Sequence, residues 1–137
     1  MPIPVVTEKT YSIELVSANP SYLYVFGDNL HRKGKGGQAI IRDLPNTFGI
    51  ATKAAPSNSE RAFFSEHYDK HFRELLLDVC NLIYIINSPV SRYKKVVLPY
   101  YGLGTGLAQL PQRCPNYYKL LYQLVYLNNG INLSHLE

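Results

Sequence analysis

The feature that most restricts the fold of this chain is an apolar run that passes directly into a glycine-rich loop. The run comprises residues 22–26, and the loop comprises residues 27–38, which contain four glycines and several basic side chains. A nearly continuous apolar and β-prone run is typical of a strand buried in a parallel sheet. A glycine-laden loop behind such a strand brings backbone N–H groups close to phosphates. The segment therefore favours an α/β fold with an anion-binding loop at the end of a strand.

Length and composition indicate one domain that spans residues 1–137. A chain of 137 residues can bury its own core, and 46% hydrophobic with 18% charged residues indicates neither a disordered nor a membrane-spanning chain. The apolar runs are shorter than the ~20 residues of a transmembrane helix, so we expect no membrane partner. The first six residues lack the features of a signal peptide, which favours a cytoplasmic protein. Cys80 and Cys114 are then expected to be free thiols.

The spacing of apolar residues predicts strands that alternate with helices. The predicted strands are residues 11–16, 22–26, 48–52 and 95–101. The predicted helices are residues 38–44, 59–87 and 115–127. Ser59 is a plausible N-cap, and the spacing leaves open whether residues 59–87 form one helix or two. Strands separated by helices predict a layered α/β domain with its ligand chemistry at the loops beyond the carboxyl ends of the strands.

A second glycine loop, residues 102–106, follows the predicted strand 95–101. Either loop alone is compatible with a tight turn, whereas the pair favours a ligand site. Neither loop fits the P-loop or the dinucleotide fingerprint, and Pro111 argues against a helix that begins directly after the second loop. The net charge of +4 suggests an anionic partner. We therefore expect a diphosphate between the two loops, with Arg32, Lys33 or Lys35 near its charge.

The order of these motifs resembles that of a macrodomain, the α/β/α module that binds ADP-ribose. The resemblance depends on Asn29, on Gly-Lys-Gly-Gly at residues 34–37, on Ala-Thr-Lys at residues 51–53, and on the strand and loop at residues 99–107. These motifs are similar to those of the DNA ADP-ribosyl glycohydrolase antitoxins, and the match spans roughly residues 22–107. The resemblance implies a single three-layer α/β/α macrodomain-like domain with a mixed central sheet.

The chain departs from that branch at three places, one of which is Asp28, since a Gly-Asp-Asn sequence before the loop is less usual for the branch. Ala51 stands where the branch often has proline, and Leu103 stands where it has cysteine. Some macrodomain hydrolases carry an acidic residue in the second loop, but Gly106 and Leu107 occupy that stretch here. These differences bear on the reaction more than on the ligand.

The resemblance also implies a role for each matched residue. Lys53 becomes the catalytic residue, assisted by Asn29 at the distal ribose, and neither a metal nor a cofactor is implied. An amine whose pKa is lowered by burial or by neighbouring cations acts as a nucleophile at neutral pH. The alternative for Lys53 is an ordinary solvated lysine, and the alternative for Asp28 is an Asx turn. The implied ligand-binding residues are Asp28, Gly34, Lys35, Gly36, Gly37, Gln38, Thr52, Gly102, Leu103, Gly104, Thr105, Gly106 and Leu107.

The function that this resemblance implies is removal of ADP-ribose from a modified nucleobase in DNA, or from another ADP-ribosylated target. The partners are then ADP-ribose or an ADP-ribosylated substrate, with DNA as the modified substrate. Two alternatives stay open. One is a non-catalytic module that binds or sequesters ADP-ribose or a related NAD-derived nucleotide signal. The other is a nucleic-acid-binding protein that uses the basic loop alone.

Other aromatic and histidine residues have simpler interpretations. His67 and His71 are spaced for a shared metal, but the sequence places no third ligand, so we interpret them as surface residues. Tyr100 and Tyr101 are candidates for the wall of a nucleobase pocket. The remaining tyrosine cluster is interpreted as helix packing with hydroxyls that reach solvent, and it comprises Tyr117, Tyr118, Tyr122 and Tyr126.

Overall fold

In the computed structural model, which describes residues 2–133 and 135, four strands form one sheet in the order β1-β4-β2-β3. The strands are β1 (Val5–Glu8), β2 (Tyr22–Asn29), β3 (Thr47–Lys53) and β4 (Lys95–Pro99). All pairings between neighbouring strands are parallel. The predicted mixed sheet is therefore wrong, although the α/β class is confirmed. Helical segments connect the strands, so each strand can enter the sheet in the same direction.

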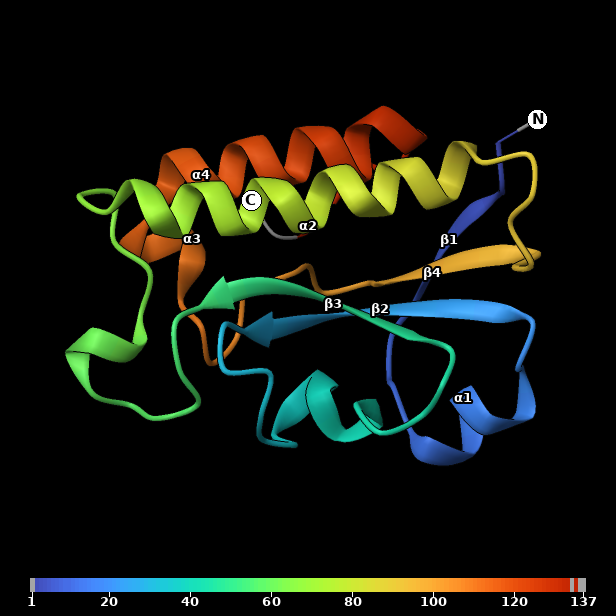
Figure 1. The fold of residues 1–137 in the computed structure, drawn as a ribbon, viewed down its shortest axis with the longest axis horizontal. Coiled ribbons are helices and arrows are strands. Elements are labelled where there is room, and N and C mark those ends of the chain that lie inside the picture. Colours follow the sequence, from blue (N-terminus) through green and yellow to red (C-terminus); the bar gives the residue numbers. More distant parts are fainter. Residues whose placement is uncertain (1, 134, 136–137) are drawn as a thin grey trace.

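Helices cover both faces of this sheet (Figure 1). The long helix α2 (Asp69–Asn87) and helix α4 (Pro115–Leu121) lie on one face. Helix α1 (Ile13–Ala18) and the 3-10 helix η1 (Gly37–Ile41) lie on the other. The buried face of α2 contains Leu75, Val79, Leu82 and Ile86. These side chains join the larger of two buried clusters, and the sheet separates that cluster from a smaller one beside α1.

The strand order creates a crevice between β2 and β4. The connections β1–α1–β2 and β3–α2–β4 run in opposite directions along the sheet. Right-handed crossovers that run in opposite directions cover opposite faces, as α1 and α2 do (Figure 1). Strand β2 is followed by η1 on one face, whereas β4 leads toward α4 on the other. Ligands of open α/β sheets bind at this kind of switch point, outside the carboxyl ends of the strands.

The predicted strand at residues 11–16 is wrong, because most of this segment belongs to α1. Ser12 caps the helix, and its hydroxyl accepts a hydrogen bond from the Leu15 N–H at 3.0 Å. Tyr11 precedes the helix and donates its hydroxyl to the Val25 carbonyl at 2.7 Å. The strand that pairs with β4 at this edge is instead β1, which the sequence interpretation missed. Alternation over six residues was too short to exclude a capped helix.

The segment predicted as one helix or two between residues 59 and 87 contains the 3-10 helix η2 (Glu60–Ala62) and α2. Ser59 stands at the N-cap position of η2, but its side chain makes no capping hydrogen bond. We expected Pro111 to prevent a helix directly after the second glycine loop. This expectation is wrong, because the short helix α3 (Leu110–Arg113) begins there. Proline is tolerated in the first turn of a helix, where its missing N–H has no intrahelical acceptor.

The C-terminal helical segment begins at Pro115 as predicted and passes from α4 into the π-helix η3 (Tyr122–Tyr126) and the 3-10 helix η4 (Leu127–Asn129). The prediction that its tyrosine hydroxyls reach solvent is wrong for Tyr126, because this hydroxyl is buried and donates to the Pro99 carbonyl at 2.8 Å. Cys80 and Cys114 are free, as expected. Within residues 2–133 and 135, no helix combines the length and the apolar character needed to cross a membrane.

Candidate functional site

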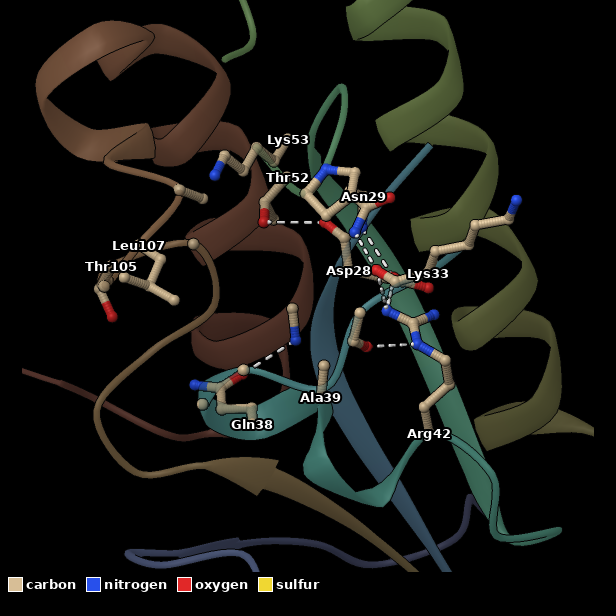
Figure 2. Close-up of a pocket in the computed structure, with 18 of the residues that line it drawn as sticks. Asp28, Asn29, Lys33, Gln38, Ala39, Arg42, Thr52, Lys53, Thr105 and Leu107 are labelled. Atoms are coloured by element: carbon tan, nitrogen blue, oxygen red, sulfur yellow. Dashed lines mark hydrogen bonds and ion pairs between the residues drawn. The ribbon is translucent and has the colours of Figure 1, made fainter. Parts of the chain in front are cut away.

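A cavity of about 370 Å³ opens at the carboxyl ends of β2 and β3, between the two glycine loops (Figure 2). Most of the predicted site residues line it. These are Asp28, Asn29, Gly34, Gly36, Gly37, Gln38, Thr52, Lys53, Gly104, Thr105, Gly106 and Leu107. Three predicted residues, Lys35, Gly102 and Leu103, are not part of its wall. Leu103 is fully buried and anchors the second loop in the core.

Gln38 joins the two glycine loops at the crevice between β2 and β4. The two strands pair only along Tyr22–Tyr24 and Lys95–Val97, so their carboxyl ends separate. The Gln38 side chain bridges the gap, since its Oε1 accepts from the Gly27 N–H at 2.9 Å and its Nε2 donates to the Gly102 carbonyl at 3.0 Å. Gly102 therefore does not line the cavity, but its carbonyl holds the Gln38 side chain that connects the two loops.

Asp28 lies on the cavity wall, but its carboxylate is directed at arginines. Oδ1 accepts from Arg42 Nη2 at 2.6 Å and from the Asn29 N–H at 2.8 Å, and Oδ2 accepts from Arg32 Nη1 at 3.3 Å. Arg32 Nη2 also donates to both carboxylate oxygens of Asp78 on α2, at 2.8 and 3.0 Å. This network ties the first glycine loop to β2 and α2, so the Asp28 charge is already compensated by the protein.

Arg42 and Asp78 were missed by the sequence interpretation. Arg42 donates to the Gly34 carbonyl at 2.8 Å and to the Lys33 carbonyl at 3.1 Å. These hydrogen bonds fix the backbone of the first glycine loop. Asp78 also accepts from the Ala51 N–H at 2.7 Å. A signal for Asp78 was present, because an acidic residue on the apolar face of an amphipathic helix requires a partner. No local pattern indicated Arg42.

Asn29 uses both ends of its side chain inside its own loop. Oδ1 accepts from the His31 N–H at 3.0 Å, and Nδ2 donates to the Lys33 carbonyl at 2.7 Å. Arg32 adopts the left-handed conformation in the same turn, with φ of 55°. Asn29 thus lines the cavity and at the same time fixes the path of the loop, which is the Asx-turn chemistry typical of this residue.

The basic residues of the first loop are mostly paired. Arg32 is bound by Asp28 and Asp78, and Lys35 forms an ion pair with Asp43. Of the three residues expected near a diphosphate charge, only Lys33 lines the cavity. Its side chain extends away from Asn29 in Figure 2. The basic side chains of the first loop therefore contribute only Lys33 to the cavity wall.

Both glycine loops contain backbone donors that have no acceptor within the described part of the protein. Within the described part of the chain, the N–H groups of residues 33–36 and 104–108 donate no hydrogen bond. Gly104 has φ of 75°, and a Cβ there would lie 3.0 Å from the Cβ of Thr52 and 2.9 Å from that of Leu110. Glycine at this position therefore lets the second loop pass close to β3. Successive free N–H groups in such loops form anion-binding concavities.

Lys53 is the cationic side chain at the end of β3, and it is buried, with 7% of its surface exposed. Its Nζ lies 4.8 Å from the centroid of the Phe63 ring, and among the described residues it forms no hydrogen bond and no ion pair. Burial lowers the pKa of the Lys53 ammonium below its ordinary value, and repulsion from Arg113 lowers it further. The solvated-lysine alternative therefore does not fit this environment.

Comparison with known protein families gives one match. Residues 6–124 match a family of unknown function, DUF7831. The chain belongs to this family. No curated protein and no solved structure matches the chain. The match spans both glycine loops and Lys53, so the cavity of this DUF7831 domain lies within the family region.

The aromatic and histidine residues of this DUF7831 domain lie in different environments. Tyr100 stacks on His135, whereas Tyr101 is 52% exposed and lines both the main cavity and a neighbouring cavity of about 310 Å³. His71 stacks on Phe64, and its Nδ1 accepts from the Ser65 N–H at 2.9 Å. Within residues 2–133 and 135, no three His, Cys, Asp or Glu side chains are grouped as a metal site.

Proposed function

We propose that this protein is a cytoplasmic macrodomain-like hydrolase that removes ADP-ribose from a modified nucleobase in DNA or from another ADP-ribosylated target. One observation carries the proposal. The amine of Lys53 is buried, has no acceptor among the described residues, and belongs to the wall of a cavity framed by two glycine loops. Buried amines with a lowered pKa are typical of catalytic lysines.

The backbone of the two loops supports a diphosphate as part of the ligand. Both loops line the cavity, and the N–H groups of Gly34, Gly36 and residues 104–108 on its wall donate no hydrogen bond within the described part of the chain. A diphosphate offers several acceptor oxygens to donors on both sides. Binding through backbone donors needs few cationic side chains, which agrees with the internal pairing of Arg32 and Lys35.

The neighbouring cavity supports a ligand with two separate parts. It shares Gly37, Gln38 and Tyr101 with the main cavity, and Glu8 lies in its wall. ADP-ribose has a distal ribose at one end of its diphosphate and an adenosine at the other. The main cavity would hold the distal ribose and the diphosphate, and the neighbouring cavity would hold the adenosine beside the exposed ring of Tyr101.

The proposed chemistry uses Lys53 as a nucleophile. Its neutral amine attacks the anomeric carbon of the distal ribose, and the bonding pair of the glycosidic bond leaves with the base, which takes up the proton that the alkylated amine releases. Water then displaces the lysine and releases ADP-ribose. Asn29 keeps the first loop in the shape that places the ribose beside this amine.

The test is release of ADP-ribose from ADP-ribosylated DNA, RNA and protein by the wild-type chain. We expect Lys53→Ala to lose turnover and to keep its affinity for ADP-ribose. The matched control is Lys35→Ala, because Lys35 is exposed, is paired with Asp43 and does not line the cavity. If the wild-type chain released no ADP-ribose from any of the three substrates, the proposed hydrolase function would be wrong.

A non-catalytic ADP-ribose binder is the second candidate, and the state of Asp28 favours it. Asp28 is the acidic residue on the wall of the main cavity, and two arginines hold its carboxylate. It is therefore poorly placed to activate a water molecule. Calorimetry with ADP-ribose, combined with an assay for product, separates the two candidates. DNA affinity that falls steeply with salt and does not compete with ADP-ribose would instead support simple nucleic-acid binding.

A further inference from the structure

Phe63 brings two cationic side chains to one aromatic ring. Lys53 Nζ lies 4.8 Å from the ring centroid, and Arg113 Cζ lies 3.6 Å from it. The ring is buried, and an antiparallel backbone bridge between Lys53 and Phe63 keeps it beside the end of β3. A cation near the face of a ring is attracted by the ring quadrupole. Phe63 therefore holds two like charges close together, at the edge of the cavity.

Arg113 is fixed in this position from two sides. Its two terminal nitrogens donate to the Glu60 carboxylate at 2.9 and 3.1 Å, and its Nε donates to Gln109 Oε1 at 3.0 Å. A bidentate carboxylate contact restricts both the place and the plane of a guanidinium group. Glu60 belongs to η2 and Arg113 to α3, so the pair also connects the segment after β3 with the segment after the second glycine loop.

Of the other charged groups near this end of the sheet, Lys33 lines the cavity and the two aspartates are paired with arginines. On β2, Asp28 is held by Arg32 and Arg42, and on α2, Asp78 is held by Arg32. The second loop, residues 102–108, has no charged side chain, and Tyr101 is the titratable residue beside it on the cavity wall. In η2, Arg61 is exposed, and the 85% exposed Glu60 side chain points its oxygens at Arg113.

We propose that Arg113 is a positioning residue for Lys53: its positive charge disfavours the protonated form of the lysine, and its guanidinium group holds the Phe63 ring against the lysine. The catalytic meaning of this role rests on the proposed function of Lys53. The electrostatic effect itself does not, because it acts in the free protein. Arg113 does not line the main cavity, so it affects the reaction through Lys53 and not through the ligand.

The test measures the reactivity of individual lysines in the full chain without ligand. The protein is acetylated with limiting acetic anhydride between pH 6 and pH 11, and the labelled peptides are quantified by mass spectrometry. In Arg113→Gln we expect Lys53 to titrate at higher pH and its labelling at neutral pH to fall by about threefold, the size typical of an exposed charge interaction. Arg113→Lys keeps the charge and should stay near wild type. Lys35 serves as the internal control.

Two results would overturn the proposal. One is unchanged Lys53 labelling in Arg113→Gln, and the other is an equal decrease in Arg113→Lys, which retains the positive charge. Arg113→Met is a second neutral variant and should reproduce Arg113→Gln, so a folding defect in one variant does not decide the result. ADP-ribose calorimetry on the same proteins separates this proposal from the function. Failure of the wild-type chain to bind ADP-ribose would remove the proposed function and leave the labelling result valid.

Discussion

The carboxylate of Asp28 occupies the space beside Gly49 that a side chain at position 49 would need. A Cβ added to Gly49 would meet the Asp28 carboxylate and lie 2.9 Å from the Asp28 Cβ. The two residues lie on neighbouring strands, where Phe26 pairs with Gly49 and Asp28 pairs with Ala51. The absence of a side chain on β3 thus makes room for the ion-pair network behind the first glycine loop.

We expect Gly49→Ala to destabilise the protein because Asp28 must move away from Arg32 and Arg42. Overpacking of a filled interior typically costs about 1–3 kcal/mol, measured here as a loss in the free energy of unfolding in urea. Gly106→Ala is the control, since nothing lies within 4 Å of a Cβ at that position. An equal effect of the two substitutions would contradict the steric explanation.

Gln38→Leu should weaken both the fold and the site. It leaves the Gly27 N–H and the Gly102 carbonyl without their partner at the crevice, with a cost of about 1–3 kcal/mol in unfolding free energy. The two loops also lose their direct connection, so we expect weaker binding of ADP-ribose in calorimetry. The exposed Gln112, substituted by alanine, is the matched control. Unchanged stability of Gln38→Leu would show that water replaces the bridge without loss.

Lys53→Met should stabilise the protein at neutral pH, because it removes a buried ammonium for which the described residues provide no hydrogen-bond or ion-pair partner. The pKa of Lys53 is lower in the folded chain than its ordinary value of 10.5, so the unfolded chain binds this proton more tightly. Stability therefore rises as pH increases from the folded pKa toward 10.5. We expect Tm of Lys53→Met to exceed that of wild type at pH 7 by about 2–6 °C.

The same comparison at pH 10 provides the check on the sign. The difference in Tm between Lys53→Met and wild type should become smaller as Lys53 of the folded wild type loses its proton. Lys35→Met, which removes an exposed lysine, should show no such convergence. A difference that stays constant from pH 7 to pH 10 would mean that the charge of Lys53 does not cause it.

His71 should make the fold sensitive to mild acid. Its Nδ1 accepts the Ser65 N–H, which requires an unprotonated nitrogen, and burial lowers the pKa of the ring below 6.5. The contribution of His71 to stability is present above pH 6.5 and is lost as pH falls through the lowered pKa. Thermal unfolding between pH 7 and pH 5 should show this decrease in wild type, a smaller one in His71→Phe, and the wild-type decrease in His67→Gln.

Much of the sheet and of the cavity wall could be predicted from the sequence. The apolar runs that became β2 and β4 were correctly placed because central parallel strands are buried on both faces, and the edge strand β3 was found because its second half is buried as well. Loops that follow such strands must meet at one edge of the sheet, so Lys53 and the glycines were expected there. The edge strand β1 was missed because its exposed face has no apolar run.

The charges and side-chain bridges could not be predicted from the sequence. Arg42 binds Asp28 across 14 positions, and Arg32 binds Asp78 across 46, so no local pattern connects the partners. The sequence therefore suggested a basic loop beside a phosphate, whereas these arginines are used to hold the loop in place.

The sequence by itself determined where the chain is apolar, where its backbone turns, and that Lys53 follows a buried strand. Those properties depend on neighbours along the chain. Only the tertiary structure decided that Lys53 has no acceptor among the residues that the structure describes, that Phe63 and Arg113 lie beside it, and that Gln38 joins the two loops. Charge state and hydrogen bonding depend on what lies within a few ångströms in space, and for Lys53 those groups come from segments far apart in the sequence.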